Sequence, residues 1–200
     1  MEHKNQVPTA SLQSMDSAHH LHPFTDTLAL SNSGCRVITH ADGVYIWDSE
    51  GHKMLDGMAG LWCVNIGYGR QSIADVAAKQ LMELPYYNSF FQCSNPPAIQ
   101  LAKEVAELAP AHMNKVFFTS SGSESNDTNL RLVHRYWQLK GQPNKKTIIS
   151  RKNGYHGSTI ASACLGGMNG MHEQIGSSIP NVVHIQQPYW YGEGRDLSPE

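Results

Sequence analysis

The sequence lacks most of the features that mark disulfide-bonded, zinc-binding and membrane proteins. Its four cysteines are far apart and form no C-x-x-C pair, which argues against a disulfide framework and a zinc site. No apolar run is long enough to span a bilayer, and the polar first residues contain no apolar stretch typical of a signal peptide. We therefore expect a cytoplasmic protein without a membrane partner.

A strong net charge is also missing. Fifteen basic and 17 acidic residues leave a net charge of -2, so a nucleic-acid partner is not expected. The eleven histidines form no H-E-x-x-H motif. The cluster His19, His20 and His22 could bind a transition metal, but a polar N-terminal segment is the simpler interpretation, and we expect no metal.

What the sequence does contain is an ordinary globular composition, with 40% apolar and 16% charged residues. Residues 1–33 are polar and predict an extended lead-in with at most a short helix. Residues 36–39 and 44–47 flank a D-G turn signal, and 53–56 form a third short apolar segment. This pattern predicts a small antiparallel meander.

After Gly57, helical patterns alternate with single apolar strands. Helices are predicted at 72–84, 95–109, 119–140 and 158–165, and strands at 116–118, 147–150 and 182–185. Such alternation indicates an α/β fold with a mostly parallel sheet. We divide the chain into 1–58, the lead-in and meander, and 59–200, the first part of a large α/β domain. Ser198-Pro199-Glu200 reads as a helix start, so we expect the chain to be the front part of a longer protein.

Hydroxyl groups and a glycine follow the predicted strand 116–118, in the turn Thr119-Ser120-Ser121-Gly122-Ser123. A helix start offers unpaired N–H groups and a partial positive charge, which suit a phosphate dianion. Glycine allows a close backbone approach, and serine hydroxyls add neutral donors. The turn matches neither a P-loop nor a dinucleotide-binding fingerprint nor a nucleophile elbow. From spacing alone, a phosphate site and a plain helix cap with spare serines are equally good interpretations.

A second strand end carries Gly154-Tyr155-His156-Gly157 before the helix predicted at 158–165. A tyrosine there is placed to lie over a flat heteroaromatic ring whose phosphate binds at the first turn. Taken alone, the segment is better explained by a tyrosine that packs under a loop.

Together the motifs F-F-T-S-S-G-S-E-S-N-D-T, Y-H-G, Leu61-Trp62 and N-I-G-Y-G-R resemble the class III aminotransferases. These are enzymes of fold type I that use pyridoxal 5'-phosphate (PLP), and within the class the sequence is most similar to the ω-transaminases of the amine–pyruvate or β-alanine–pyruvate group. The resemblance covers nearly the whole chain from about Pro23 onward. It implies a large domain with a mostly parallel sheet, beside a small domain that contains the meander.

The resemblance also assigns site residues. Cofactor-binding residues would be Ser121, Gly122 and Ser123 at the phosphate, Tyr155 stacked on the ring and His156 beside it. The substrate-binding residues it implies are Phe24, Leu61, Trp62 and Phe90, the last reaching across a homodimer interface. Each of these four fits ordinary core packing about as well when taken singly.

The implied reaction is PLP-dependent transamination of an amine or ω-amino acid, with pyruvate or a similar keto acid or aldehyde as acceptor. In the family the cofactor-binding lysine, the acidic partner of the ring nitrogen and a carboxylate-binding arginine lie downstream of the position of Glu200. We therefore assign no catalytic residue here and expect the 200-residue chain alone to be inactive. The alternatives are an ornithine or γ-aminobutyrate aminotransferase, an aminomutase or a decarboxylase, or a non-catalytic binding module if the chain is complete.

Overall fold

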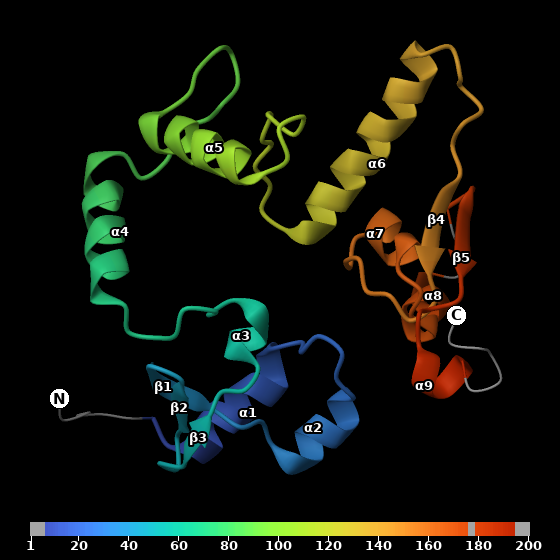
Figure 1. Ribbon diagram of the computed structural model, residues 1–200. Helices are drawn as coiled ribbons and strands as arrows, with labels where there is room; N and C mark the ends of the chain where they lie inside the picture. Colours follow the sequence, from blue (N-terminus) through green and yellow to red (C-terminus); the bar gives the residue numbers. More distant parts are fainter. Residues whose placement is uncertain (1–6, 176–178, 195–200) are drawn as a thin grey trace. The chain divides into compact units, whose positions relative to one another are not determined.

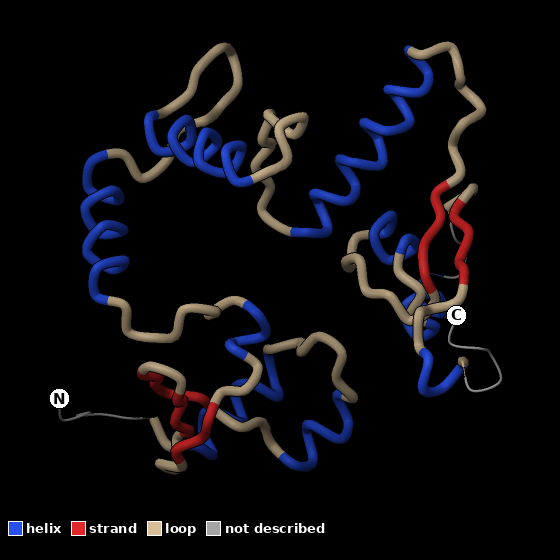
Figure 2. The backbone as a smooth tube through the Cα atoms, viewed as in Figure 1, coloured by secondary structure: helices blue, strands red, loops and turns tan. Residues whose placement is uncertain are grey.

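A computed structural model describes residues 7–175 and 179–194 and divides the chain into two compact units, Met1–Ser94 and Asn95–Glu200 (Figure 1; Figure 2). The expected domain division at 58/59 is a different boundary and stays a prediction. The expected helix start at Ser198 lies outside the described residues. In the described part of the chain, no helix is both long and apolar enough to cross a membrane.

The first unit begins with two helices, α1 (Thr9–His19) and α2 (Thr27–Ser33). The prediction of an extended lead-in was wrong here. None of the residues of α1 is buried, so its sequence carries no periodic apolar stripe from which the helix could be predicted. The α2 helix has a signal that could have been used, because the Asp26 carboxylate accepts hydrogen bonds from the N–H groups of Leu28 and Ala29, both at 3.0 Å.

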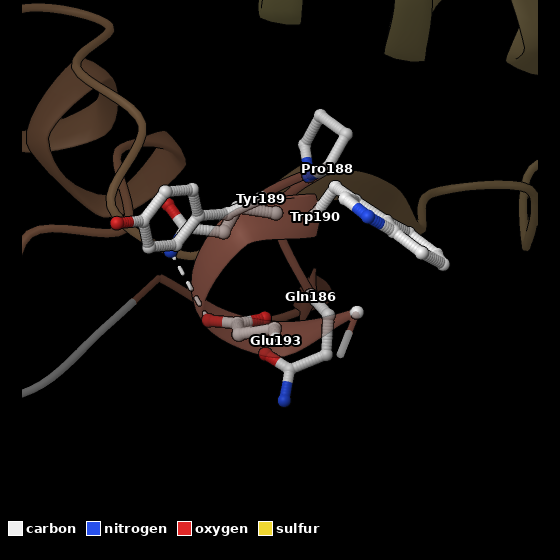
Figure 3. Close-up of a pocket in the computed structure, with 7 residues that line it drawn as sticks. Gln186, Pro188, Tyr189, Trp190 and Glu193 are labelled. Atoms are coloured by element: carbon white, nitrogen blue, oxygen red, sulfur yellow. Dashed lines mark hydrogen bonds between the residues drawn. The ribbon is translucent and has the colours of Figure 1, made fainter. Parts of the chain in front are cut away.

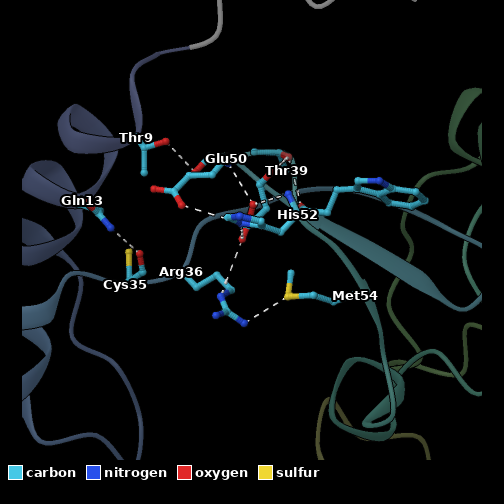
Figure 4. Close-up of polar contacts among 11 residues, drawn as sticks. Thr9, Gln13, Cys35, Arg36, Thr39, Glu50, His52 and Met54 are labelled. Atoms are coloured by element: carbon cyan, nitrogen blue, oxygen red, sulfur yellow. Dashed lines mark hydrogen bonds and ion pairs between the residues drawn. The ribbon is translucent and has the colours of Figure 1, made fainter.

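The predicted meander is present as an antiparallel sheet in the order β1 (Ile38–Asp42), β2 (Tyr45–Asp48) and β3 (Lys53–Leu55). Asp42 pairs with Tyr45, so the hairpin turn contains only Gly43 and Val44, and Gly43 has a φ of 57°. In the β2–β3 turn, the buried Asp48 carboxylate accepts hydrogen bonds at 3.0 and 2.9 Å from the backbone N–H groups of Glu50 and His52, the two residues of this turn that Figure 4 labels. These two hydrogen bonds hold the β2–β3 turn in place.

Two predicted helices are present, and only the second of them has a side-chain N-cap. The second helix after the meander, α4 (Gln71–Glu83), ends two residues before Pro85, and α5 (Pro96–Leu108) begins after Asn95. The Asn95 side chain accepts a hydrogen bond from the N–H of Ala98 at 3.1 Å, as an N-cap should. Their apolar stripes are exposed, with Val76 at 69% and Leu108 at 90%.

In the second unit, the long helix α6 (Gly122–Leu139) precedes the parallel pair β4 (Ile148–Arg151) and β5 (Val182–Ile185). The short helices α7 (Ile160–Leu165) and α8 (Asn169–Ile175) lie between these strands in sequence, and α9 (Trp190–Glu193) follows β5. A parallel β–helix–β crossover was expected from the alternating pattern. The buried residues of this unit gather around α7, where Ser162, Ala163 and Cys164 are the best covered.

The predicted strand at 116–118 is not formed, because these residues pair with no strand in the described part of the chain. An apolar run shows that a segment suits a buried strand, whereas a strand exists only where a neighbour completes its hydrogen bonds. That neighbour could not be read from the run itself.

Candidate active site

The turn at Ser121–Ser123 is the start of α6. Ser121 is the N-cap, and its hydroxyl oxygen accepts a hydrogen bond from the N–H of Glu124 at 3.1 Å, while the Glu124 carboxylate accepts one from the N–H of Ser120 at 2.8 Å. Gly122 and Ser123 occupy the first two helical positions, whose N–H groups have no helical carbonyl to bond. A Cβ at Gly122 would meet nothing within 4 Å, so the helix start is open to a ligand.

The loop that carries Tyr155 and His156 is attached to this helix start. The Asn126 side-chain amide donates to the carbonyl of His156 at 2.7 Å, and the N–H of Ser158 donates to the Ser123 hydroxyl oxygen at 3.0 Å. The structure therefore brings together both parts of the expected cofactor site, although 32 positions separate Ser123 from Tyr155 in the sequence. Tyr155 is 51% exposed, which leaves its ring accessible.

Asp127 and Ser162 form a second connection that the sequence did not reveal. One carboxylate oxygen of Asp127 accepts hydrogen bonds from the Thr159 hydroxyl at 2.8 Å, the Ser162 hydroxyl at 2.9 Å and the Ser162 N–H at 3.1 Å. The Ser162 hydroxyl also lies 2.8 Å from the carbonyl of Ser123, and Ser162 is fully buried. Asp127 lies four residues after Ser123, so this i,i+4 spacing places both residues on one face of the helix, but no spacing in the sequence indicates the partner Ser162.

Gly157 is required by this connection. Its φ is 135°, and a Cβ there would lie 2.5 Å from the Ser123 hydroxyl oxygen and 2.7 Å from the Cβ of Ser162. Gly167 is similarly constrained, because a Cβ would come within 2.6 Å of the Cα of Lys152. Gly157 thus lets the loop approach the helix start closely, and Gly167 lets the chain after α7 approach the backbone of residues 151–153.

Leu61 and Trp62, two of the expected substrate residues, belong to a left-handed turn, α3 (Ala59–Trp62), in the first unit. Left-handed backbone costs about 1–2 kcal/mol for each residue other than glycine. Only eight such residues have a positive φ in the described part of the chain, and they include Leu61 at 57°, Trp62 at 67° and a third substrate residue, Phe24, at 50°. Backbone of this kind concentrates at functional sites, so the observation supports these three assignments.

The carboxylate of Asp56 holds the left-handed turn in place. It accepts hydrogen bonds from the Tyr68 hydroxyl at 2.7 Å and the N–H of Gly60 at 2.8 Å. The hydrogen bond from Tyr68 lowers the pKa of Asp56 below its ordinary value of 3.8, and the same bond raises the pKa of Tyr68. The turn is therefore anchored through a charged group.

Phe90 lies in another turn of the first unit, where its N–H donates to the Asn88 side-chain oxygen at 2.9 Å. Its side chain is 73% exposed. The four expected substrate residues and the five expected cofactor residues thus belong to different units, each described by itself.

A separate hollow of about 360 Å³ is lined by residues 186–190, 193 and 194, around α9 (Figure 3). Gln187 donates to the Glu193 carboxylate across it at 3.1 Å. None of the expected site residues lines this hollow.

A family model for the class-III aminotransferases matches residues 29–196, which is most of the chain. This chain belongs to the class-III aminotransferases. The cofactor of that family is PLP, as the resemblance implied, and the α/β fold type is confirmed with it.

The aminotransferase chain is similar to several named proteins. It is 59% identical to the putrescine–pyruvate aminotransferase of Pseudomonas aeruginosa and 39% identical to the γ-aminobutyrate transaminase 3 of Solanum lycopersicum, over 96% and 94% of its own length. A solved structure, an (S)-enantioselective ω-transaminase from Thermomicrobium roseum, matches 97% of the chain with a TM-score of 0.92 and 40% identity. The chain spans only 42%, 36% and 43% of these three proteins.

The residues at the start of α6 fit the phosphate of PLP. Two N–H groups point out of a helix of 18 residues, and two serine hydroxyls flank them. The oxygens of Ser121 and Ser123 each accept one backbone hydrogen bond, so their O–H groups remain able to donate. The open space at Gly122 would admit a phosphate oxygen.

Proposed function

We propose that this chain is part of a PLP-dependent ω-transaminase that moves the amino group of an amine or ω-amino acid to pyruvate or a similar acceptor. The observation that carries the proposal is the attachment of the Tyr155–His156 loop to the helix start at Ser121–Ser123. A phosphate site and an aromatic residue held at a fixed separation suit a phosphorylated heteroaromatic cofactor.

In this proposal each cofactor residue has a defined task. The N–H groups of Gly122 and Ser123 and the hydroxyls of Ser121 and Ser123 bind the phosphate, and Tyr155 covers one face of the ring with His156 beside it. Bound PLP supplies the electron sink for amino-group transfer, and the protein supplies orientation. The hydrogen bonds from Asn126 to the carbonyl of His156 and from the Thr159 hydroxyl to Asp127 hold the loop next to the helix start.

The proposed donor is an apolar or extended amine. Phe24, Leu61, Trp62 and Phe90 would line the substrate pocket, and apolar side chains favour such amines over dicarboxylates. The similarity to a putrescine–pyruvate aminotransferase supports a short aliphatic diamine as donor and pyruvate as acceptor.

The test uses the full-length protein loaded with PLP. With putrescine and pyruvate, we expect alanine to form at least tenfold faster than with γ-aminobutyrate and pyruvate. Absence of alanine with every amine donor, from a folded protein that binds PLP, would exclude transamination to pyruvate.

The second candidate is a γ-aminobutyrate transaminase, which the 39% identity to the Solanum lycopersicum protein favours. It predicts the opposite order of donors in the same assay. The donor panel therefore separates the two candidates in one experiment.

Several properties of the whole protein remain part of the proposal. We propose a homodimer with Phe90 at the subunit interface, and a cytoplasmic location, which the wide cysteine spacing favours. We also propose that the 200-residue chain is inactive alone, since none of its lysines matches the family's cofactor-binding position.

A further inference from the structure

The end of α1 places one carboxylate and two imidazoles on the same side of the chain. Asp16 and His20 are four residues apart, one turn along the helix end, so their side chains lie on one face. His20 is the C-cap and has an extended backbone, with φ of -110° and ψ of 116°. In extended chain, residues two apart share a face, which returns His22 to the side of His20.

The three side chains converge, so that their possible ligand atoms lie close to one another. His22 Nε2 lies 2.9 Å from both carboxylate oxygens of Asp16, and His20 Nδ1 lies 3.1 Å from one of them. The two imidazole ring centroids are 4.2 Å apart. One possible ligand atom from each of the three residues lies within 4.8 Å of the other two.

These separations suit a small tetrahedral ion. Nitrogen and oxygen ligands bind Zn²⁺ at about 2.0–2.2 Å, which places two ligands of one tetrahedron about 3.3 Å apart. The imidazoles and carboxylate therefore need to move only slightly to exchange their mutual hydrogen bonds for bonds to a metal. Imidazole nitrogen with one carboxylate oxygen is also a ligand set that Zn²⁺ accepts.

Partial burial distinguishes this cluster from a chance contact between exposed side chains. The side chains of Asp16 and His22 are 17% and 24% exposed, whereas that of His20 is 63% exposed and leaves one side open. Asp16 and His22 are thus largely covered by the protein, and His20 would complete the site from the solvent side. The histidine spacing alone had not favoured a metal, because it does not include Asp16.

We propose that Asp16, His20 and His22 bind one divalent transition-metal ion, with Zn²⁺ as the best match and a water molecule in the fourth position. The cluster lies in the first unit, whereas the cofactor residues of the transaminase site lie in the second, and no step of the proposed reaction uses the metal. Its role would be to lock the end of α1 to the segment that leads to Phe24.

The test is zinc binding by the full-length protein after dialysis against a chelator. Competition with a chromophoric chelator should show one Zn²⁺ bound per chain at micromolar concentration or below. His22→Ala and the more exposed His20→Ala should each weaken binding at least tenfold. His19→Ala is the matched control, since His19 is exposed, adjacent and outside the cluster, and it should leave the affinity unchanged.

Three results would overturn the proposal. They are a wild-type protein that binds no stoichiometric zinc, a His22→Ala variant that binds as tightly as wild type, and a His19→Ala variant that loses as much affinity as His22→Ala. Circular dichroism and PLP absorbance of each variant, measured without metal, show that the fold is intact before zinc is added.

Discussion

At the scale of single residues, Gly157 is the position where the site tolerates least change. Its positive φ and its close approach to Ser123 leave no room for a side chain. We predict that Gly157→Ala lowers the PLP affinity of the full-length protein at least tenfold, because a Cβ would push the loop away from the helix start. Absorbance titration measures the affinity. Gly170→Ala is the control, since a Cβ there would meet nothing within 4 Å, and an equal loss in both variants would contradict the prediction.

Asp127 is a residue of the same network that touches no cofactor in our proposal. Asp127→Ala removes the acceptor for the N–H of buried Ser162, whose hydroxyl can still donate to the carbonyl of Ser123. An unsatisfied buried donor costs about 1–3 kcal/mol, so we expect the free energy of unfolding to fall by that amount. We also expect weaker PLP binding.

Asp127→Asn retains an acceptor oxygen and should recover most of both losses. Chemical denaturation and PLP titration check the pair. If the Asn variant lost as much stability and PLP affinity as the Ala variant, the negative charge of Asp127, and not its acceptor oxygen alone, would be required.

At the scale of elements, the left-handed turn α3 stores backbone strain that glycine would relieve. Leu61→Gly and Leu61→Ala both remove the exposed side chain, but only glycine adopts a φ of 57° without cost. Strain relief of about 1–2 kcal/mol exceeds the added unfolded-state entropy of about 0.4–1 kcal/mol. We therefore predict that the Gly variant unfolds with a free energy about 0.5–1 kcal/mol higher than the Ala variant. A Gly variant that is about 0.4–1 kcal/mol less stable than the Ala variant by chemical denaturation would show that the turn is unstrained.

The Asp56–Tyr68 hydrogen bond should make the stability of the same turn depend on pH. The folded pKa of Asp56 is below its ordinary value of 3.8, so its stabilisation is complete above that value and is lost as pH falls through the folded pKa. Asp56→Asn cannot titrate, and the stability difference between wild type and variant should shrink as pH drops from 6 to 3. Denaturation of both proteins across this range measures it. A difference that stays constant would refute the anchor.

Local signals explain which elements the sequence predicted well. Helix α5 could be placed from Asn95 and the prolines after it, and β5 from its apolar run, because caps and short-range patterns act within a few residues. Helix α1 was not predicted, and the strand predicted at 116–118 was wrong. Both errors arise because burial and strand pairing depend on parts of the chain that are distant in sequence. The Asp127–Ser162 bond, 35 positions apart in sequence, could not be found by spacing either.

At the scale of the whole molecule, the proposed function depends on a phosphate site that two segments share. Each segment alone had an ordinary structural explanation, a helix cap for Ser121 and a packed tyrosine for Tyr155. Their attachment through Asn126 and Ser123 is what the sequence could suggest only by resemblance. The other feature at this scale is the exposure of apolar side chains on α4 and α5, such as Val76 and Leu108.

The most direct measurement is whether the helix start at Ser121–Ser123 recognises the phosphate of PLP. Full-length wild-type protein should bind PLP far more tightly than pyridoxal, which lacks the phosphate. Hydrogen bonds to a charged group are worth about 1.5–3 kcal/mol each, so a Ser121→Ala, Ser123→Ala double variant should lose at least tenfold of that preference. Ser120→Ala, just outside the helix, should keep it. A double variant that prefers PLP as strongly as wild type would contradict the account.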